Sequence, residues 1–165
     1  MAPKNNEIRY FSNPWRSGQD VIGCDYRDDS SGEMTYASYL LFSSKTPNSP
    51  ASQRFLFHDV EEEKGEYTCR LQFSGSHYDK YWLDVSGDYL RPYGSSSCRW
   101  RFVDKGDYVE WRVHASGRIV TMKYHSSLFV AKSRKQDGLC SSSYLTVSDA
   151  IDTSNPSAAK FQARA

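Results

Sequence analysis

Aromatic, acidic and basic side chains gather around one short turn near the middle of the sequence. Tyr81-Trp82 precede the turn Ser86-Gly87-Asp88, and Tyr89-Leu90-Arg91-Pro92-Tyr93 follow it. A pyranose has an apolar face that stacks on aromatic rings and a rim of hydroxyl groups that carboxylates, hydroxyls and guanidinium groups can hydrogen-bond. These residue types favour a sugar site. The alternative, that Tyr81, Trp82 and Tyr89 fill the core and only the turn is exposed, carries equal weight, and Tyr81 and Trp82 lean toward the core because they lie inside a predicted strand.

Residue patterns typical of enzymes and metal proteins do not occur in the sequence. The four histidines form no H-x-x-x-H pair, no H-E-x-x-H motif and no short cluster with cysteine or carboxylate at ligand spacing. There is no G-x-S-x-G turn for a nucleophilic serine and no glycine-rich phosphate-binding motif. We therefore predict no catalytic residue, no metal site and no cofactor.

Charge is balanced, with 21 basic and 20 acidic residues, so no net field would attract nucleic acid or an anionic membrane. Residues 132–138 are locally basic but contain no aromatic residue, which favours a solvated hairpin loop over an RNA or phosphoinositide site. Residues 59–66 are rich in glutamate but lack the alternating oxygen-ligand spacing of a calcium loop. They are predicted to form a solvated turn.

The sequence also carries hints of a compartment. No apolar stretch is long enough for a membrane span, and residues 1–7 lack the apolar run of a signal peptide. The cysteines Cys24, Cys69, Cys98 and Cys140 include no C-x-x-C pair, so free thiols are expected in place of disulfides or zinc. The expected location is cytoplasmic or nucleocytoplasmic, with no membrane insertion.

Short aromatic segments separated by Ser, Gly, Asp, Asn and Pro predict strands, and no window shows sustained helical periodicity. Three segments share a pattern that begins with Tyr39-Leu40, Tyr89-Leu90 or Tyr144-Leu145 and runs through a loop to an aromatic strand at 53–57, 98–102 or 160–163. Two more strand candidates precede each mark, at 8–12 and 21–26, at 67–73 and 81–85, and at 119–124 and 127–131. Chance is the alternative, because Tyr-Leu is a common dipeptide in a chain with 12 tyrosines.

Four strands per segment, three times over, predict an all-β fold of the β-trefoil type, with six barrel strands and six strands in capping hairpins. The predicted domain is single and covers residues 1–165, with repeats at approximately 7–60, 66–113 and 118–165.

The same residues resemble the agglutinin domain of amaranthin-like plant lectins, which fold as β-trefoils. The resemblance covers roughly residues 36–163. Its motifs are Tyr39-Leu40-Leu41-Phe42-Ser43-Ser44 with Phe55, then Cys69-Arg70-Leu71-Gln72 followed by Asp79-Lys80-Tyr81-Trp82, and then Ser97-Cys98-Arg99-Trp100-Arg101-Phe102. Each motif is short, so the resemblance lies in their order and spacing.

This resemblance implies a carbohydrate-binding protein without catalysis that recognises galactose-type sugars, N-acetylgalactosamine especially, at a site between domains of a head-to-tail dimer. The turn at Ser86, Gly87, Asp88 and Tyr89 matches part of that site. The family's best-known member has Asn-His where this chain has Gly87-Asp88, and it pairs two trefoils per chain where this sequence has one. The sugar and the intermolecular site therefore stay open.

The sequence thus predicts a lectin that binds glycans, with a homodimer as the expected source of avidity. The candidate contact residues are Ser86, Asp88, Tyr89, Arg91 and Tyr93. One alternative is a β-trefoil protease inhibitor that presents a rigid loop to a protease cleft. Another is a filament-binding or scaffold domain similar to the fascins, and an enzyme is the least favoured class.

Overall fold

The computed structural model describes residues 2–13, 19–27, 34–43, 53–75, 78–132 and 137–165, and for 19–27, 34–43, 124–132 and 137–144 it gives the strands without their side chains. The described residues form strands and a single 3₁₀ turn, η1 (Pro156–Ala159), which is too short and too polar to cross a membrane. The strands are β1 (Ile8–Asn13), β2 (Gln19–Arg27), β3 (Met34–Ser43), β4 (Arg54–Glu63), β5 (Glu66–Ser74), β6 (Trp82–Ser86), β7 (Tyr89–Tyr93), β8 (Trp100–Asp104), β9 (Val109–Val113), β10 (Ile119–Lys132), β11 (Asp137–Ser148) and β12 (Gln162–Arg164).

Side-chain alternation explains why these segments form strands. In β5, Tyr67, Cys69, Leu71 and Phe73 are buried, and the residues between them are partly exposed. Successive side chains of a strand point to opposite faces, so this period of two places one row of apolar side chains in the core. The paired strand β4 contributes Phe55 to the same core, directly opposite Phe73.

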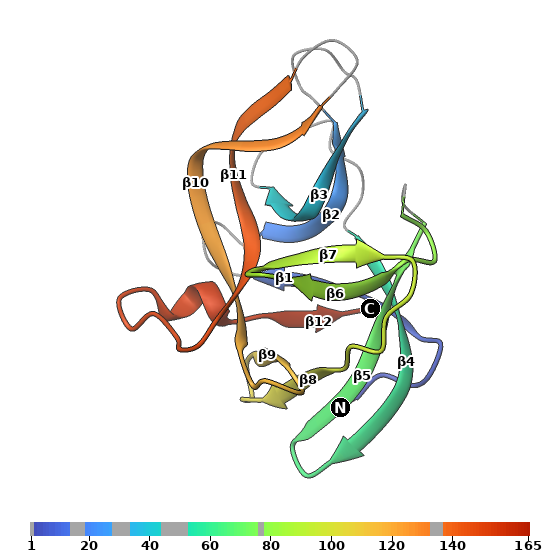
Figure 1. Ribbon diagram of the computed structural model, residues 1–165. Coiled ribbons are helices and arrows are strands. Elements are labelled where there is room, and N and C mark those ends of the chain that lie inside the picture. Colours follow the sequence, from blue (N-terminus) through green and yellow to red (C-terminus); the bar gives the residue numbers. More distant parts are fainter. Residues whose placement is uncertain (1, 14–18, 28–33, 44–52, 76–77, 133–136) are drawn as a thin grey trace.

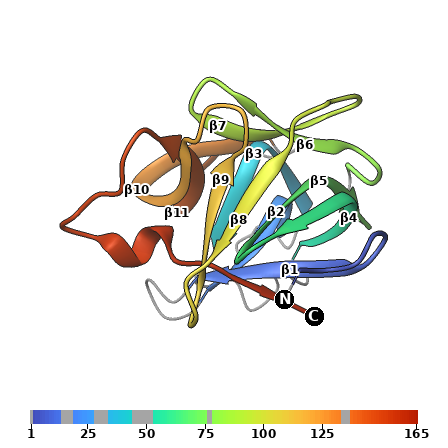
Figure 2. The same cartoon turned by 90° about the horizontal axis from the view of Figure 1, so that it is seen from below.

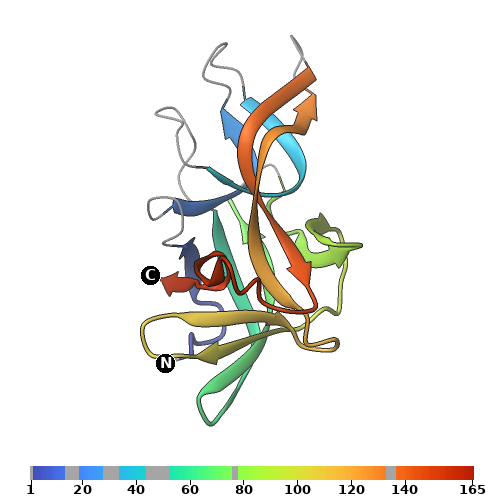
Figure 3. The same ribbon diagram turned by 90° about the vertical axis from the view of Figure 1, so that its left-hand side faces the viewer.

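Seven of the strands close into an antiparallel barrel in the order β5, β6, β7, β11, β10, β9 and β8, with β8 pairing back to β5. Closure satisfies the backbone groups that an open sheet edge would leave unpaired. The hairpins β2–β3 and β10–β11 continue upward beyond this barrel and pair with each other through β3 (Figures 1 and 3).

Strands β1, β4, β5, β8, β9 and β12 lie lower in the molecule (Figures 1 and 2). Side chains of β1, β4, β5, β8 and β9, with Phe161, form the aromatic core. A backbone bridge between Val109 and Phe161 joins β9 to the segment leading into β12. At the centre, the Phe11 ring stacks on Trp111 with centroids 4.3 Å apart and on Phe102 at 5.4 Å. Aromatic contacts of this kind add to the free energy gained by burying the rings.

The chain is all-β as predicted, but the prediction of a β-trefoil made of three four-strand repeats is wrong, because the structure is a closed seven-stranded barrel. The third repeat shows where the pattern failed. Residues 119–124 and 127–131 were expected to be two strands and are one, β10, because a bulge between His125 and Leu128 lets the strand continue. Conversely, β9 forms at Val109–Val113, where no strand was predicted.

Candidate functional site

The predicted sugar-binding residues lie on the hairpin formed by β6 and β7 (Figure 1). Leu83 and Leu90 have almost no exposed surface and attach the hairpin to the core. Because alternate residues of a strand face opposite ways, the residues on either side of these leucines face away from the core. The buried leucines therefore determine which side chains the hairpin presents outward.

Three cross-strand pairs form the outward face. Ser86 lies opposite Tyr89, Asp84 opposite Arg91, and Trp82 opposite Tyr93. We call these six residues the hairpin face. Four of the five predicted contact residues belong to it, namely Ser86, Tyr89, Arg91 and Tyr93, and all four are half-buried. The structure places these four on one face of the hairpin, together with Trp82 and Asp84.

Arg91 stands between the two tyrosines of this face. Its guanidinium carbon lies 5.9 Å from the centroid of the Tyr89 ring, within the range of a cation–π contact. Tyr89 and Tyr93 are four residues apart on one strand, which places their Cα atoms roughly 13 Å apart at the usual rise per residue. Two rings with a guanidinium between them match the length of a short oligosaccharide better than that of a single sugar.

Asp88, the fifth predicted residue, lies in the turn and makes contacts outside the hairpin. Its carboxylate accepts a hydrogen bond of 2.8 Å from the Arg118 guanidinium. Its backbone carbonyl accepts hydrogen bonds from the backbone N–H of Val147, at 2.9 Å, and from the hydroxyl of Thr146. Both donors to this carbonyl belong to β11, so Asp88 positions the hairpin.

Arg118 joins several segments at this point. It also donates to the carbonyl oxygens of Val147, at 3.0 Å, and Gly87, at 3.4 Å, and it forms an ion pair of 3.2 Å with Asp149. The hydrogen bond with Asp88, supported by the charge of Asp149, raises the pKa of Arg118. The turn is therefore attached to the barrel by a permanently charged group.

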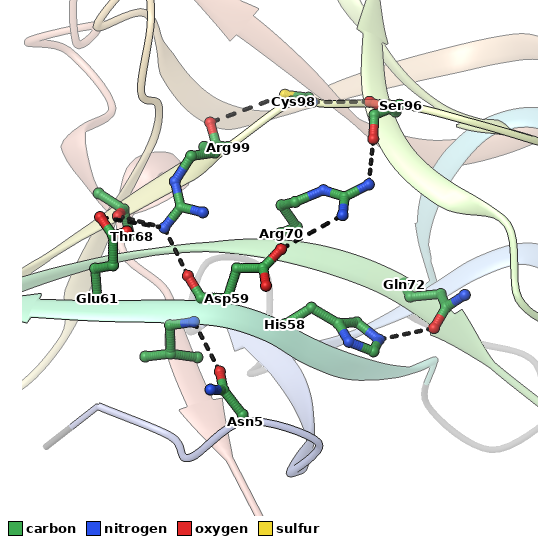
Figure 4. Close-up of polar contacts among 11 residues, drawn as sticks. Asn5, His58, Asp59, Glu61, Thr68, Arg70, Gln72, Ser96, Cys98 and Arg99 are labelled. Carbon is green, nitrogen blue, oxygen red and sulfur yellow. Dashed lines mark hydrogen bonds and ion pairs between the residues drawn. The ribbon is translucent and has the colours of Figure 1, made fainter.

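The Trp82 ring already contacts two other side chains of the protein. The Arg70 guanidinium lies 3.8 Å from the Trp82 ring centroid, and the His58 ring lies 5.0 Å away. Arg70 is held in turn by an ion pair of 3.4 Å with Asp59 and by a hydrogen bond to the Ser96 carbonyl (Figure 4). Stacking by Arg70 covers the Trp82 ring, so Trp82 supports the hairpin face and does not offer its ring to a ligand.

A polar network behind the hairpin fixes the position of Asp84. The Ser96 hydroxyl donates to Asp84 Oδ2 at 2.7 Å and accepts from the backbone N–H of Cys98 at 2.9 Å, and the second contact appears in Figure 4. Asp84 Oδ1 accepts from the backbone N–H of Val85 at 2.6 Å. Both carboxylate oxygens of Asp84 therefore have partners within the protein.

The β4 bulge completes this network on its other side (Figure 4). Asp59 has a φ of 52°, unusual for a residue other than glycine, at the register shift between His58 and Glu61. Its carbonyl accepts a hydrogen bond of 2.6 Å from Arg99, which also donates to Thr68 Oγ1 at 2.8 Å. The bulge thus turns Asp59 toward both Arg70 and Arg99.

Tyr81 differs from the expectation drawn from the sequence. Its side chain is 41% exposed, whereas the sequence placed it nearer to the core. The reason is that β6 begins at Trp82, so Tyr81 precedes the alternating segment and packs edge to face on Tyr78, with ring centroids 5.4 Å apart. An exposed ring outside the hairpin face makes Tyr81 a useful control residue.

Two thiols lie among the described side chains, and both are free. Burial raises the pKa of Cys69 far above its usual range and raises that of Cys98 to about 12. In the described part of the chain no three His, Cys, Asp or Glu side chains converge as a metal site requires. The side chains of Cys24 and Cys140 lie outside the described residues.

Comparison with known proteins gives this chain no relative, since no protein-family model, no curated protein and no solved structure matches it.

Proposed function

We propose that the protein is a non-catalytic carbohydrate-binding protein that holds a glycan on the hairpin face. The observation that carries the proposal is the register of β6 and β7, which places Tyr89, Arg91, Tyr93 and Ser86 on one side of the hairpin. Two aromatic rings, a guanidinium and a hydroxyl on a rigid two-stranded support match the mixed apolar and polar surface of a sugar.

Each side chain has a role in this proposal. The rings of Tyr89 and Tyr93 stack on the C–H faces of two sugar units. The planar Arg91 guanidinium donates parallel hydrogen bonds to neighbouring hydroxyl groups between them. Galactose-type sugars suit such rings because their axial 4-hydroxyl leaves one face of the pyranose apolar, and we propose them as ligands, with N-acetylgalactosamine among them.

The direct test is a glycan array followed by calorimetric titration of the best ligand. We expect Tyr89→Ala and Tyr93→Ala each to weaken binding about fivefold to thirtyfold, since an aromatic stacking contact contributes on the order of 1–2 kcal/mol. Tyr81→Ala removes an exposed ring outside the face and should leave affinity unchanged. A folded sample that binds no glycan, or equal losses in all three variants, contradicts the proposal.

Assays of the same sample against a panel of proteases test the main alternative function, that of a protease inhibitor. Inhibition of a protease together with a blank glycan array would assign the protein to the inhibitor class.

Avidity from a homodimer is a further part of the proposal, because two copies of a weak site raise the effective concentration of the second. Light scattering at the concentration used for binding tests it, and a monomer would contradict it.

A further inference from the structure

A pocket of about 410 Å³ is lined by residues of the β4–β5 hairpin, the β8–β9 turn and β12. It shares no residue with the hairpin face. Its volume falls in the range of about 300–1,000 Å³ that is usual for small-molecule sites. The side chains that matter to the argument are four carboxylates, two tyrosines and one arginine, namely Glu62, Glu66, Asp104, Asp107, Tyr67, Tyr108 and Arg9.

The wall of this pocket is strongly acidic. Arg9 is the basic residue in it, and its guanidinium is already paired with Glu7 at 3.0 Å. By contrast, the carboxylates of Glu62, Glu66 and Asp107 have no ion pair with any described residue. A concave surface lined by charges of one sign concentrates counter-ions of the other sign. The charge of the wall therefore selects a cation.

The Tyr67 hydroxyl is a second and independent sign of a ligand. Tyr67 lines the pocket and is 8% exposed, and no described residue forms a hydrogen bond with its hydroxyl. Burial raises its pKa, and the charges that act on the hydroxyl include those of Arg9 and Asp104, which both line the pocket. Buried hydroxyl groups nearly always have a partner. A neutral hydroxyl that faces an acidic pocket is suited to accept a hydrogen bond from an ammonium group.

The remaining wall favours an organic cation over a metal ion. Val109, Ala2, Ala163 and the tyrosine rings give the pocket an apolar side that can cover methylene groups. The Tyr108 ring already attracts an ammonium, since Lys160 Nζ lies 4.9 Å from its centroid. The carboxylates are spread along the wall and, among the described residues, do not converge as ligands of one ion.

The acidic surface is longer than the pocket itself. A second hollow of about 370 Å³ shares Glu62, Glu66 and Tyr67. It adds Glu61 and Glu63, with Thr68, Arg101 and His114 on its other side. Glu63 and Glu66 lie directly opposite each other across the β4–β5 hairpin, an unfavourable arrangement for two like charges. A ligand with several positive charges spaced along a chain relieves this repulsion better than one with a single charge.

We infer that this pocket binds a linear aliphatic polyamine, with ammonium groups on the carboxylates and on the Tyr67 hydroxyl and methylene groups on the apolar wall. The sequence had indicated only a solvated turn at residues 59–66, because no calcium-loop spacing is present there. Pairing of β4 with β5 and of β5 with β8 is what brings those glutamates next to Asp104.

Calorimetric titration of the full chain with spermidine at low ionic strength tests this inference. We expect saturable binding that Mg²⁺ at equal ionic strength does not reproduce. Tyr67→Phe keeps the ring that stacks on Phe102 at 5.0 Å and removes only the hydroxyl, so it should weaken binding about tenfold, the usual effect of losing one hydrogen bond to a charged group.

Glu66→Gln should weaken binding to a similar degree, whereas Asp152→Asn, which makes the same change of charge outside the pocket, should not. Circular dichroism melting of each variant checks that it is folded. Unchanged affinity in both Tyr67→Phe and Glu66→Gln, equal binding of Mg²⁺, or no binding of spermidine to the wild-type chain would each overturn the inference. None of these outcomes depends on whether the hairpin face binds a glycan.

Discussion

The Arg118 guanidinium donates a hydrogen bond of 2.8 Å to the Asp88 carboxylate and so joins the β6–β7 turn to the start of β10. The two residues are 30 positions apart in the sequence. The candidate glycan site therefore depends on a contact between the β6–β7 hairpin and Arg118, which directly precedes β10. Its orientation is set by tertiary structure as well as by its own turn.

We expect Arg118→Ala to destabilise the protein more than Asp88→Ala does. The Asp88 side chain is 70% exposed, and an ion pair at such a surface contributes at most about 1 kcal/mol. Arg118 in addition donates to two backbone carbonyls, each hydrogen bond being worth about 0.5–1.5 kcal/mol. Urea unfolding of both variants measures the difference, and equal losses would contradict the role assigned to Arg118.

The contact between Asp88 and Arg118 also predicts how a substitution of Asp88 affects sugar binding. Because Asp88 positions the turn and the hairpin face supplies the contacts, Asp88→Ala should weaken glycan binding less than Tyr89→Ala does. Titration of one glycan into both variants decides this. A complete loss of binding in Asp88→Ala with full stability would make Asp88 a direct ligand contact.

Gly87 should not tolerate alanine. Its φ is +61°, the left-handed conformation that the first central residue of a two-residue hairpin turn requires. A Cβ there would meet no atom within 4 Å, so the cost of Gly87→Ala is backbone strain of about 1–2 kcal/mol. Gly94→Ala is the matched control, since Gly94 also has open space but no positive φ. Similar melting temperatures for the two alanine variants would refute this explanation.

Phe11→Ala should be the most damaging of these substitutions, at about 3–5 kcal/mol, because it leaves a cavity between Trp111 and Phe102. Ile8 lies on the same strand with 44% of its side chain exposed, so Ile8→Ala should cost less than about 1 kcal/mol. Chemical unfolding of both variants checks the comparison. Comparable losses would mean that the core does not centre on Phe11.

How far the sequence predicted this structure depends on which contacts are local. Strand alternation is local, and the predicted segment from Tyr89 to Tyr93 coincides with β7. Two of the three Tyr-Leu dipeptides share a buried leucine, since Leu90 and Leu145 both have no exposed surface, and the dipeptides do not mark three equal repeats. Strand β9 escaped prediction because Glu110 is buried next to buried Trp111, which breaks the expected alternation of polar and apolar residues.

The candidate glycan site could likewise be predicted from the sequence only where its contacts are local. The grouping of Ser86, Tyr89, Arg91 and Tyr93 follows from their spacing on a hairpin. The partners of Asp88 and Trp82 do not, because Arg118 and Arg70 reach them from other strands. Glu110 shows the same limit, since its burial depends on ion pairs with Arg112, at 2.9 Å, and Lys105, at 3.7 Å.

Cys69 and Cys98 should react slowly with thiol reagents in the folded protein at pH 8. The thiolate is the reactive form, and burial raises the pKa of Cys98 to about 12 and that of Cys69 still higher. Alkylation followed by peptide mass spectrometry measures each thiol separately, with the urea-unfolded protein as reference. Equal rates in the folded and unfolded states would show that these thiols are accessible.

The same shifts predict a loss of stability at alkaline pH. A thiol whose pKa is higher in the folded than in the unfolded state stabilises the folded state fully below the unfolded value and loses that contribution as the pH rises toward the folded value. For Cys98 this window runs from about pH 9 to about pH 12. Melting temperatures across this window should fall less in Cys98→Ser than in the wild-type chain.

The backbone bridge between Val109 and Phe161 and the pairing of Tyr10 with Arg164 have a consequence for biosynthesis. Strand β1 leaves the ribosome long before its partner β12. The ring of strands around Phe11 therefore closes only after translation has passed residue 164. Until then, the aromatic side chains of β1 and β4 stay partly exposed and can contact other nascent chains.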